Sequence, residues 1–344
     1  MKLGMQLNYA GGFKESAAQV STLEKAGLDI VWVAEAYGFD APSYMGYLAG
    51  LTETVTIGSA ILPIYTRTPT LLAQTAAGID AMTDGRCILG LGASGPQVIE
   101  GFHGVAYDAP IGRTREIIDV CREVWRREGP LTHEGRFYNM PLPEGTGTGL
   151  GKPLKIISHP VRSEIPIFVA SLGEKNVQMT AEIANGWLPL FYLPERADLV
   201  WGEDLAAGKA KRDDTLGPLE IAAGGIVSIT DDPDSILDFG RGMAALYIGG
   251  MGSRERNFYN QLACRYGYEK EAKEIQDLYL DGKKTEAAAL VPKEFLELTN
   301  LVGPEGYVRE RVAAFKESGV TILNVTPVAS DQVALVEKLK AWAE

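Results

Sequence analysis

One acidic residue, Glu35, stands where an enzyme could use a carboxylate, because it follows the apolar run 30–34 (IVWVA) and precedes a turn. A carboxylate at such a place can lose part of its hydration and act as an acid or base. It can equally cap a backbone or bond a neighbouring strand end. Gln6 and Asn8 alternate with apolar neighbours in residues 3–8 (LGMQLN), so they share one face of a strand. They could orient a polar ring ligand, or bond to each other.

A glycine-rich run, residues 86–97 (RCILGLGASGPQ), contains a literal match to the G-x-G-x-x-G dinucleotide fingerprint at Gly90, Gly92 and Gly95. That fingerprint opens a helix directly, inside the first strand–helix unit of its domain, with an acid about 20 positions later. Here Pro96 follows the last glycine, three strand–helix units precede it, and the candidate acid Glu116 lies in a helical pattern. We therefore interpret the run as a strand end whose loop lines a shared pocket.

Several further residues near strand ends have both a functional and an ordinary interpretation. The turn 171–176 (SLGEKN) joins a strand to a helix, so its free N–H groups could hold an anion, or it could be a plain capped helix. Arg67 could bind an anion or form a surface pair, and His103 could carry a proton or be structural. The aromatic residues that could wall a flat ring, or pack in the core, are Tyr37, Tyr65, Phe191 and Tyr192.

Composition narrows the classes of protein that fit. The 33 Lys and Arg against 45 Asp and Glu give a net charge of −12, which argues against nucleic acid or an anionic membrane as the main partner. No leader pattern and no run of about 18 apolar residues is present, so we expect a soluble, cytoplasmic protein. Three scattered cysteines without C-x-x-C, and three histidines without H-x-x-x-H, predict neither disulfides nor a metal site. A site with few acids, few histidines and no evident metal ligands suits chemistry that a bound cofactor carries out.

Alternation of strand-like and helical patterns sets the fold class. Strands are expected at 3–8, 30–34, 55–62, 87–91, 165–170, 186–190, 219–228 and 321–325. Eight such units predict an α/β protein with a (β/α)8 TIM barrel, an open doubly wound sheet being the competing architecture. We expect one domain, 1–344, with insertions at about 129–163, which holds strand-like pieces at 136–138 and 154–157, and at about 250–302, which is mostly helical. Barrel geometry places the active site at the carboxyl ends of the strands.

Five stretches together resemble the bacterial luciferase-like superfamily: MKLGMQLNY, IVWVAEAYGFDA, TIGSAILPIYTRTP, RCILGLGASGPQVIEGFHG and IPIFVASLGEKNVQMTAEIANGWLP. More narrowly they resemble its branch that uses the deazaflavin coenzyme F420. That branch includes the methylenetetrahydromethanopterin reductases, secondary alcohol dehydrogenases and glucose-6-phosphate dehydrogenases. The resemblance covers nearly the whole chain and implies a non-prolyl cis peptide at Ala60–Ile61, in a bulge of the third strand that backs the ring.

The resemblance also implies which residues hold F420. They are Glu35, Ala60, Ile61 and Pro63; Ala93, Ser94, Gly95, Pro96 and Gln97, near the ring or ribityl chain; and Ala170, Ser171, Leu172, Gly173 and Asn176, at the tail and phosphate. At the second strand this chain has Glu35-Ala36 where the alcohol and sugar-phosphate enzymes carry an Asp-His pair, so their oxidation mechanism does not transfer.

The reaction then expected is hydride transfer from reduced F420 to an activated double bond, imine or carbonyl of a small substrate, with Glu35 and Asn8 as the candidate catalytic residues. The alternatives are an FMN-dependent monooxygenase of the same superfamily, with residues 143–153 as a lid, and a non-catalytic cofactor carrier. The resemblance suggests a homodimer or a higher homo-oligomer.

Overall fold

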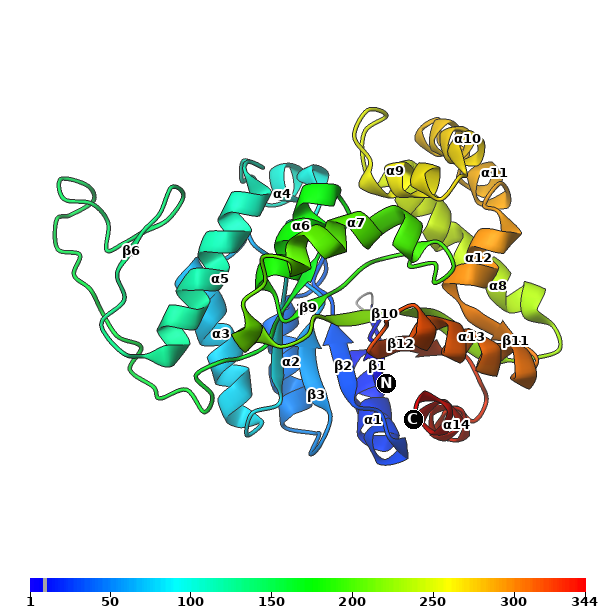
Figure 1. Cartoon of the computed structure of the whole chain (residues 1–344), viewed down its shortest axis with the longest axis horizontal. Coiled ribbons are helices and arrows are strands. Elements are labelled where there is room, and N and C mark those ends of the chain that lie inside the picture. Colours follow the sequence, from blue (N-terminus) through cyan, green and yellow to red (C-terminus); the bar gives the residue numbers. More distant parts are fainter. Residues whose placement is uncertain (9–10) are drawn as a thin grey trace.

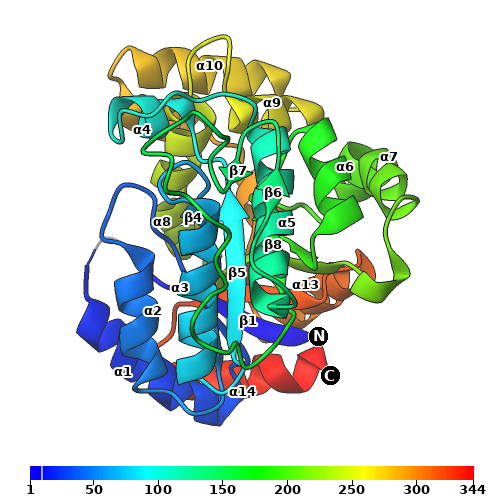
Figure 2. The same ribbon diagram turned by 90° about the vertical axis from the view of Figure 1, so that its left-hand side faces the viewer.

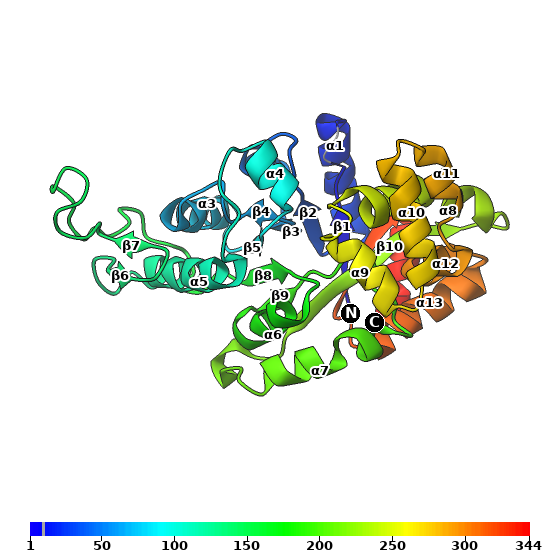
Figure 3. The ribbon, with the colours of Figure 1, turned by 90° about the horizontal axis from the view of Figure 1, so that it is seen from above.

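The computed structural model describes residues 1–8 and 11–344, and within them eight parallel strands close into a barrel surrounded by helices (Figures 1 and 3). In order around the barrel these are β1 (Lys2–Gln6), β2 (Ile30–Val33), β3 (Thr56–Ser59), β5 (Cys87–Gly92), β8 (Ile167–Ala170), β9 (Gly186–Trp187), β10 (Glu220–Ile229) and β12 (Ile322–Pro327). The pairing of β12 with β1 closes the ring, with Gly4 opposite Asn324. The predicted (β/α)8 barrel is therefore confirmed, and the open sheet is excluded.

Two shorter strands extend this arrangement. β4 (Leu62–Pro63) continues the line of β3 after a break and pairs with β5. β11 (Leu301–Gly303) pairs with the carboxyl half of β10, where β9 no longer reaches. The sequence predicts a mostly helical segment up to about residue 302 and does not reveal β11, because three residues are too few to carry a strand pattern.

The helices that follow the strands cover the outside of the barrel. They are α1 (Phe13–Leu23), α2 (Ala41–Ala49), α3 (Pro69–Met82), α5 (Pro110–Arg126), α6 (Glu174–Ile183), α7 (Ala197–Lys209), α8 (Pro233–Ala245), α13 (Glu305–Glu317) and α14 (Gln332–Ala343). Side-chain caps fix several starts: Asp40 accepts from the N–H of Ser43, and Thr68 accepts from the N–H of Leu71. In Figure 2, β5 runs between α3 and α5.

Two helix starts correct the sequence-based expectation. α5 begins at Pro110 rather than near Thr114, since a proline is accepted in a first helical turn. A short helix, α4 (Pro96–Gly101), begins directly after Gly95, so the argument that Pro96 prevents the glycine run from opening a helix was wrong. The position of β5 as the fourth strand of a barrel still separates this run from a dinucleotide fold.

Two long connections leave the barrel. The first lies between α5 and β8 and projects from the body (Figures 1 and 3); it contains the antiparallel pair β6 (His133–Glu134) and β7 (Asn139–Met140). The strand-like pieces predicted at 136–138 and 154–157 are not strands. Residues 136–138 form the turn of this pair, because the Glu116 carboxylate on α5 accepts their three backbone N–H groups at 2.9 to 3.1 Å.

The second long connection precedes β11 and is helical. It continues α8 through a π-helical turn (Leu246–Gly250) into α9 (Phe258–Arg265), α10 (Glu269–Leu280), α11 (Lys284–Ala289) and α12 (Lys293–Thr299). In Figure 1 these helices lie together on one side of the barrel, beside α8 and β11. Apolar side chains of this group, among them Ile275 and Phe295, join the main hydrophobic core.

Alternation along the strands divides the core in two. Outward-facing residues pack under the helices in one large cluster, whereas the barrel interior holds a smaller one. The interior cluster comprises Ile30, Trp32, Ile88, Phe168, Leu188, Ala222 and Ile322, with Ala60, Ile61 and Ala170 at its edge. Side chains of the interior cluster therefore fill the middle of the barrel, and small residues line it towards the carboxyl ends of β3, β5 and β8.

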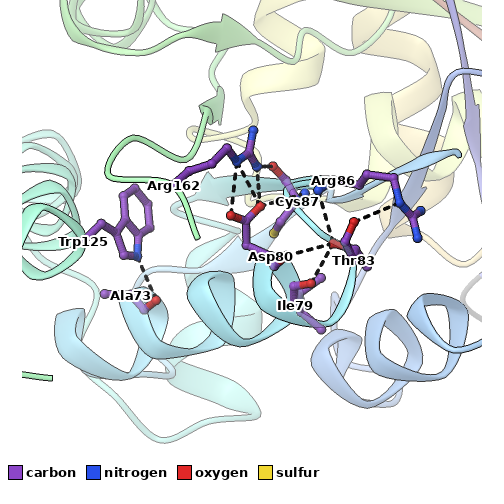
Figure 4. Close-up of polar contacts among 8 residues, drawn as sticks. All are labelled: Ala73, Ile79, Asp80, Thr83, Arg86, Cys87, Trp125 and Arg162. Atoms are coloured by element: carbon purple, nitrogen blue, oxygen red, sulfur yellow. Dashed lines mark hydrogen bonds and ion pairs between the residues drawn. The ribbon is translucent and has the colours of Figure 1, made fainter. Parts of the chain in front are cut away.

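A buried ion pair fastens the returning end of the first long connection to the barrel (Figure 4). Asp80 on α3 is fully buried, and Arg162 donates to its two oxygens from Nε at 3.1 Å. Arg162 Nη2 also donates to the Cys87 carbonyl at 2.7 Å, and the Cys87 N–H donates to Asp80 at 3.2 Å. These contacts hold α3, the start of β5 and residue 162 as one unit.

Candidate active site at the carboxyl ends of the strands

The third barrel strand breaks at a non-prolyl cis peptide, Ala60–Ile61, which confirms the bond expected there. Ser59, just before it, is tied to β5, since its hydroxyl donates to the Gly90 carbonyl at 2.9 Å and lies 2.8 Å from the Gly90 nitrogen. A Cβ at Gly90 would lie 1.7 Å from the Ser59 carbonyl oxygen, so the backbones approach as closely as glycine alone permits. One step further along β5, a Cβ at Gly92 would lie 2.9 Å from Cγ1 of Ile61.

These residues belong to an apolar area that we call the ring shelf, formed by Ala60, Ile61, Gly92 and Ala170. The four positions come from β3, β5 and β8 and their ends, which are neighbours in the barrel. Ala60, Ile61 and Ala170 are partly buried and pack on the interior cluster. Such an apolar area suits contact with a planar, largely apolar ring system.

The loop after β5 borders the shelf. Ala93, Ser94, Gly95 and Pro96 are half-buried and Gln97 is exposed. Ser94 has φ 59°, an uncommon conformation for a non-glycine residue, and Tyr107 donates to its carbonyl at 3.4 Å. The predicted ring-contacting residues of this loop thus lie together, next to Gly92. Whether they touch a cofactor stays a prediction.

The turn after β8 is held rigidly by two indoles. Trp187 Nε1 donates to the Ser171 carbonyl at 2.8 Å, and Trp201 Nε1 donates to the Leu172 carbonyl at 3.0 Å. The Ser171 hydroxyl is buried against that of Thr180, 2.9 Å away. A ligand could therefore meet only the backbone of Ser171, whereas the half-buried Leu172 and Gly173 remain accessible.

α6 begins at this turn with unsatisfied polar groups. Gly173 precedes the helix and provides no side-chain cap, so N–H groups of the first turn point outward. Asn176 lies in the same turn, and its Oδ1 is buried without a hydrogen-bond partner among the described residues. A buried, unpartnered oxygen calls for a donor from outside the chain. Ribityl hydroxyls and a phosphate supply donors and an anion, so these residues fit a deazaflavin or flavin tail.

Glu35 makes contacts that match the ordinary interpretation of this carboxylate. Only 6% of the residue is exposed, and Arg67 donates to its two oxygens at 2.7 Å each. The N–H of Ala41, at the start of α2, donates a third bond at 2.9 Å. Arg67 is consequently neither a free anion site nor a surface pair. The proton-transfer role of Glu35 stays a prediction, and the geometry favours a positioning role.

Gln6 and Asn8 share the interior face of β1 and its extension, as their alternation indicates. Gln6 is half-buried and its Nε2 donates a long bond of 3.4 Å to the Trp32 carbonyl. Asn8 is exposed at the carboxyl end. Both lie on the side of the barrel opposite β8.

The aromatic residues near strand ends divide between wall and core. Tyr37 is exposed and lies 6.2 Å from Phe102, ring to ring, whereas Tyr192 is buried between Trp187 and Trp201. Phe191 packs on Phe295 at 5.3 Å. His103 lies edge-on to Phe102, and its Nε2 is buried without a described partner.

Tyr65 lines a pocket beside the loop after β5. Its ring lies 5.1 Å from that of Tyr107, and burial raises the pKa of both phenols, so both are protonated at neutral pH. A pocket of about 470 Å³ lies here between the start of α3 and α5. Its two arginines are each paired, Arg67 with Glu35 and Arg113 with Asp108 at 2.9 Å, so the pocket is electrically balanced.

Residues 1–8 and 11–344 contain neither a candidate metal site nor a candidate membrane-spanning helix. No group of three or more His, Cys, Asp or Glu in that part of the chain is placed to hold a metal ion. No helix there is both long and apolar enough to cross a bilayer.

Comparison with known proteins identifies the family of this chain. A family model described as luciferase-like monooxygenase matches residues 1–321. The chain belongs to the luciferase-like family. This luciferase-like chain is 42% identical over 339 residues to a putative coenzyme F420-dependent oxidoreductase of Mycobacterium tuberculosis, covering 97% of each.

Solved structures show the same fold. The F420-dependent tetrahydromethanopterin reductase of Methanopyrus kandleri matches this luciferase-like chain with a TM-score of 0.77 at 22% identity, over 98% of this chain and 97% of that one. An F420-dependent secondary alcohol dehydrogenase, solved with an F420–acetone adduct, matches with a TM-score of 0.76 at 18% identity over the full length of both.

Sequence reasoning missed some residues at the carboxyl ends of the strands. Asn324 and Thr326 alternate with apolar residues in the last strand just as Gln6 and Asn8 do in the first, and that pattern could have identified them. The tryptophans that hold the turn after β8 leave no such signal, because indole-to-carbonyl bonds depend on tertiary packing.

Proposed function

We propose that this protein is an F420-dependent oxidoreductase that moves a hydride between the deazaflavin and a small organic substrate with an activated double bond, imine or carbonyl. The observation that carries the proposal is the 42% identity, over nearly the full length of both chains, to a protein described as F420-dependent. The ring shelf and the unpartnered Asn176 oxygen at the start of α6 support it, since they match the two ends of such a cofactor.

The chain's residues would act mainly by positioning. F420 supplies the hydride when it is bound. The shelf of Ala60, Ile61, Gly92 and Ala170 would support the ring, with Pro63 and residues 93–97 at its edge. Residues 170–173 and Asn176 would hold the tail. Fixing donor and acceptor in contact contributes several kcal/mol to lowering a barrier, about 7–11 kcal/mol in the best intramolecular cases.

Glu35 would act here through Arg67 and α2. Its carboxylate accepts three hydrogen bonds and fixes the end of β2 to the start of α3. The adjacent Ala36 is half-buried with φ 47°, so the chain turns sharply where it passes the mouth. The proton that accompanies the hydride would then come from solvent or from another group at the mouth.

An FMN-dependent monooxygenase is the second candidate, because the family model is described as luciferase-like monooxygenase. The two functions differ in their reaction with oxygen, since reduced FMN reacts rapidly and reduced deazaflavin scarcely does. The test is turnover of reduced F420 under nitrogen with aldehydes, imines and enones, beside oxygen uptake with reduced FMN. Oxidation of F420 by an acceptor supports the proposal. Oxygen uptake with FMN, and no F420 oxidation, would overturn it.

Asn176 allows a test of the cofactor site, and its neighbour Lys175 provides the matched control. Asn176→Ala removes the buried oxygen, and we expect F420 binding to weaken by about tenfold, the size of one hydrogen bond to a charged or strongly polar group. Lys175→Ala alters an exposed neighbour in the same turn and should leave the affinity within about twofold. Equal affinities of both variants would remove α6 from the binding site.

We further propose that the chain acts as one domain in a cytoplasmic homodimer. Large apolar side chains lie exposed on α2, α3 and the first long connection, including Tyr47, Leu71, Leu142 and Ile157. Exposed apolar groups gathered on neighbouring elements are typical of subunit interfaces. Sedimentation velocity at micromolar concentration would give a dimer; a monomer at every concentration would contradict this proposal.

A further inference from the structure

Across the barrel from the ring shelf lies a row of uncharged polar side chains on β1 and β12. A Cβ at Gly4 would lie 2.4 Å from Asn324 Oδ1 and 2.7 Å from Trp32 Nε1, so Gly4, Asn324 and Trp32 all face the interior. Residues two positions further along each strand face the same way. Gln6 and Thr326 therefore stand in the mouth, one step beyond Gly4 and Asn324.

We call Gln6, Asn324 and Thr326 the polar ledge, and its hydrogen-bonding capacity is only partly used. Trp32 Nε1 donates to Asn324 Oδ1 at 2.7 Å, which fixes the amide and leaves its Nδ2 donor directed away from the indole. No described residue accepts from Asn324 Nδ2, or bonds to the Thr326 hydroxyl, which is exposed in the mouth. Gln6 contributes one long bond to the Trp32 carbonyl.

The position of the ledge relative to the shelf follows from the strand order. In the barrel sequence of eight strands, β12 lies opposite β5 and β1 lies opposite β8. A ring resting on Gly92 and Ala170 would thus turn its free face towards Asn324 and Gln6. A small molecule bound between them would touch the ring on one side and amide and hydroxyl groups on the other.

The shelf and the ledge themselves carry no charged side chain, and an arginine with an effect on this region, Arg256, acts on Tyr107 beside the loop after β5. The shelf is apolar, the ledge is neutral, and the nearby carboxylate, Glu35, is directed to Arg67 and Ala41. An ionised acceptor held between the two surfaces would lose hydration and meet no opposite charge on the shelf or the ledge, which costs far more than burying a neutral group that keeps its hydrogen bonds. A carbonyl or imine could exchange its water for Asn324 Nδ2 and the Thr326 hydroxyl.

We propose that the polar ledge selects an uncharged acceptor whose carbonyl oxygen or imine nitrogen accepts hydrogen bonds from Asn324 and Thr326. This inference rests on the proposed function and specifies its substrate class. On reduction the acceptor carbon, or the carbon β to the carbonyl, gains the hydride. In direct reduction the oxygen or nitrogen gains a proton from solvent, in conjugate reduction the carbon α to the carbonyl gains it, and in both cases the cofactor is oxidised by two electrons. Asn324 and Thr326 are specificity-determining residues that polarise and orient the acceptor.

The test is equilibrium binding to the protein saturated with oxidised F420, where no hydride is available and the acceptor stays unchanged. Isothermal titration calorimetry compares cyclohexenone with a cyclohexenone that carries a ring carboxylate. We expect the neutral compound to bind at least about tenfold more tightly, because the carboxylate meets no cation on the shelf or the ledge. Equal or tighter binding of the carboxylated compound, or binding of neither, would overturn the inference.

Three variants assign the effect to the ledge. Thr326→Val keeps the side-chain shape and should weaken cyclohexenone about two- to tenfold, the size of one neutral hydrogen bond. Asn324→Asp still accepts from Trp32 but replaces the donor by a carboxylate, so it should weaken the same compound more. Thr22→Val, on the outer face of α1, should change nothing. Unchanged binding to Thr326→Val and Asn324→Asp would contradict the assignment.

F420 affinity separates this inference from the proposed function. The ledge faces the acceptor, so both ledge variants should bind oxidised F420 within about twofold of the unaltered protein. If the unaltered protein itself fails to bind F420, the proposed function fails and this inference with it. If F420 binds normally while the two cyclohexenones bind alike, only the inference about substrate class fails.

Discussion

The pair formed by Glu35 and Arg67 gives the sharpest prediction about the site. Arg67 donates two bonds of 2.7 Å, and only 7% of the Glu35 side chain and 14% of the Arg67 side chain are exposed. Arg67→Met would leave a buried carboxylate with one remaining donor, the N–H of Ala41. Removing one partner of a buried ion pair costs about 3–5 kcal/mol, so we expect that loss in the free energy of unfolding.

Two further variants decide between a structural and a catalytic carboxylate. Glu35→Gln keeps the shape but loses the charge, and we expect a loss of about 1–3 kcal/mol. The double variant should be more stable than Arg67→Met alone, because replacing both charges leaves no unpaired ion. Urea unfolding followed by tryptophan fluorescence measures all three. Arg254→Met, which removes exposed or half-exposed pairs with Asp277 and Asp281, is the control and should cost at most about 1 kcal/mol.

Two results would refute this reasoning. The first is an Arg67→Met variant that is no less stable than Arg254→Met. The second is a Glu35→Gln variant with unchanged stability and unchanged F420 affinity but no turnover, which would make Glu35 a proton donor or acceptor.

Three other perturbations follow from the contacts. Gly92→Ala would bring a Cβ to 2.9 Å from Ile61 on the shelf, so F420 affinity should fall at least about tenfold, whereas Gly46→Ala on α2, with nothing within 4 Å, should bind normally in the same titration. Arg162→Met should lower the free energy of unfolding by about 3–5 kcal/mol, and adding Asp80→Asn should restore part of it. Burial raises the pKa of Glu116, but N–H donors from Phe137, Tyr138 and Arg136 outweigh it and hold the pKa below the usual 4.5. The stability this gives is present above that value and is lost as the pH falls below it, so amide exchange at 136–138 should accelerate in acid, and less steeply in Glu116→Gln.

Local sequence patterns were enough to predict the barrel and to predict that Gln6 and Asn8 share one face of a strand. Continuous apolar runs such as 30–34 identify strands buried on both faces, and the starts of α1 and α6 follow from helical spacing near Phe13 and Glu174. These features depend on neighbours in sequence, so the sequence alone specifies them.

Partners far apart in sequence could not be predicted. Arg67 meets Glu35 across 32 positions, and Arg162 meets Asp80 across 82, and neither residue type nor spacing indicates these pairs. The turn at 136–138 reads as a strand because its apolar content suits one, yet Glu116 captures its N–H groups. Glu35 was therefore open to two interpretations until its tertiary partner was visible.

Equilibrium binding of F420 and of FMN, each titrated into the purified protein and followed by quenching of the ligand's fluorescence, tests the central claim most directly. The account predicts micromolar or tighter binding of F420, weaker binding to Gly92→Ala, and little or no binding of FMN. Preference for FMN would contradict it and move the protein to the flavin monooxygenases of the family, and binding of neither would leave the barrel without its proposed cofactor.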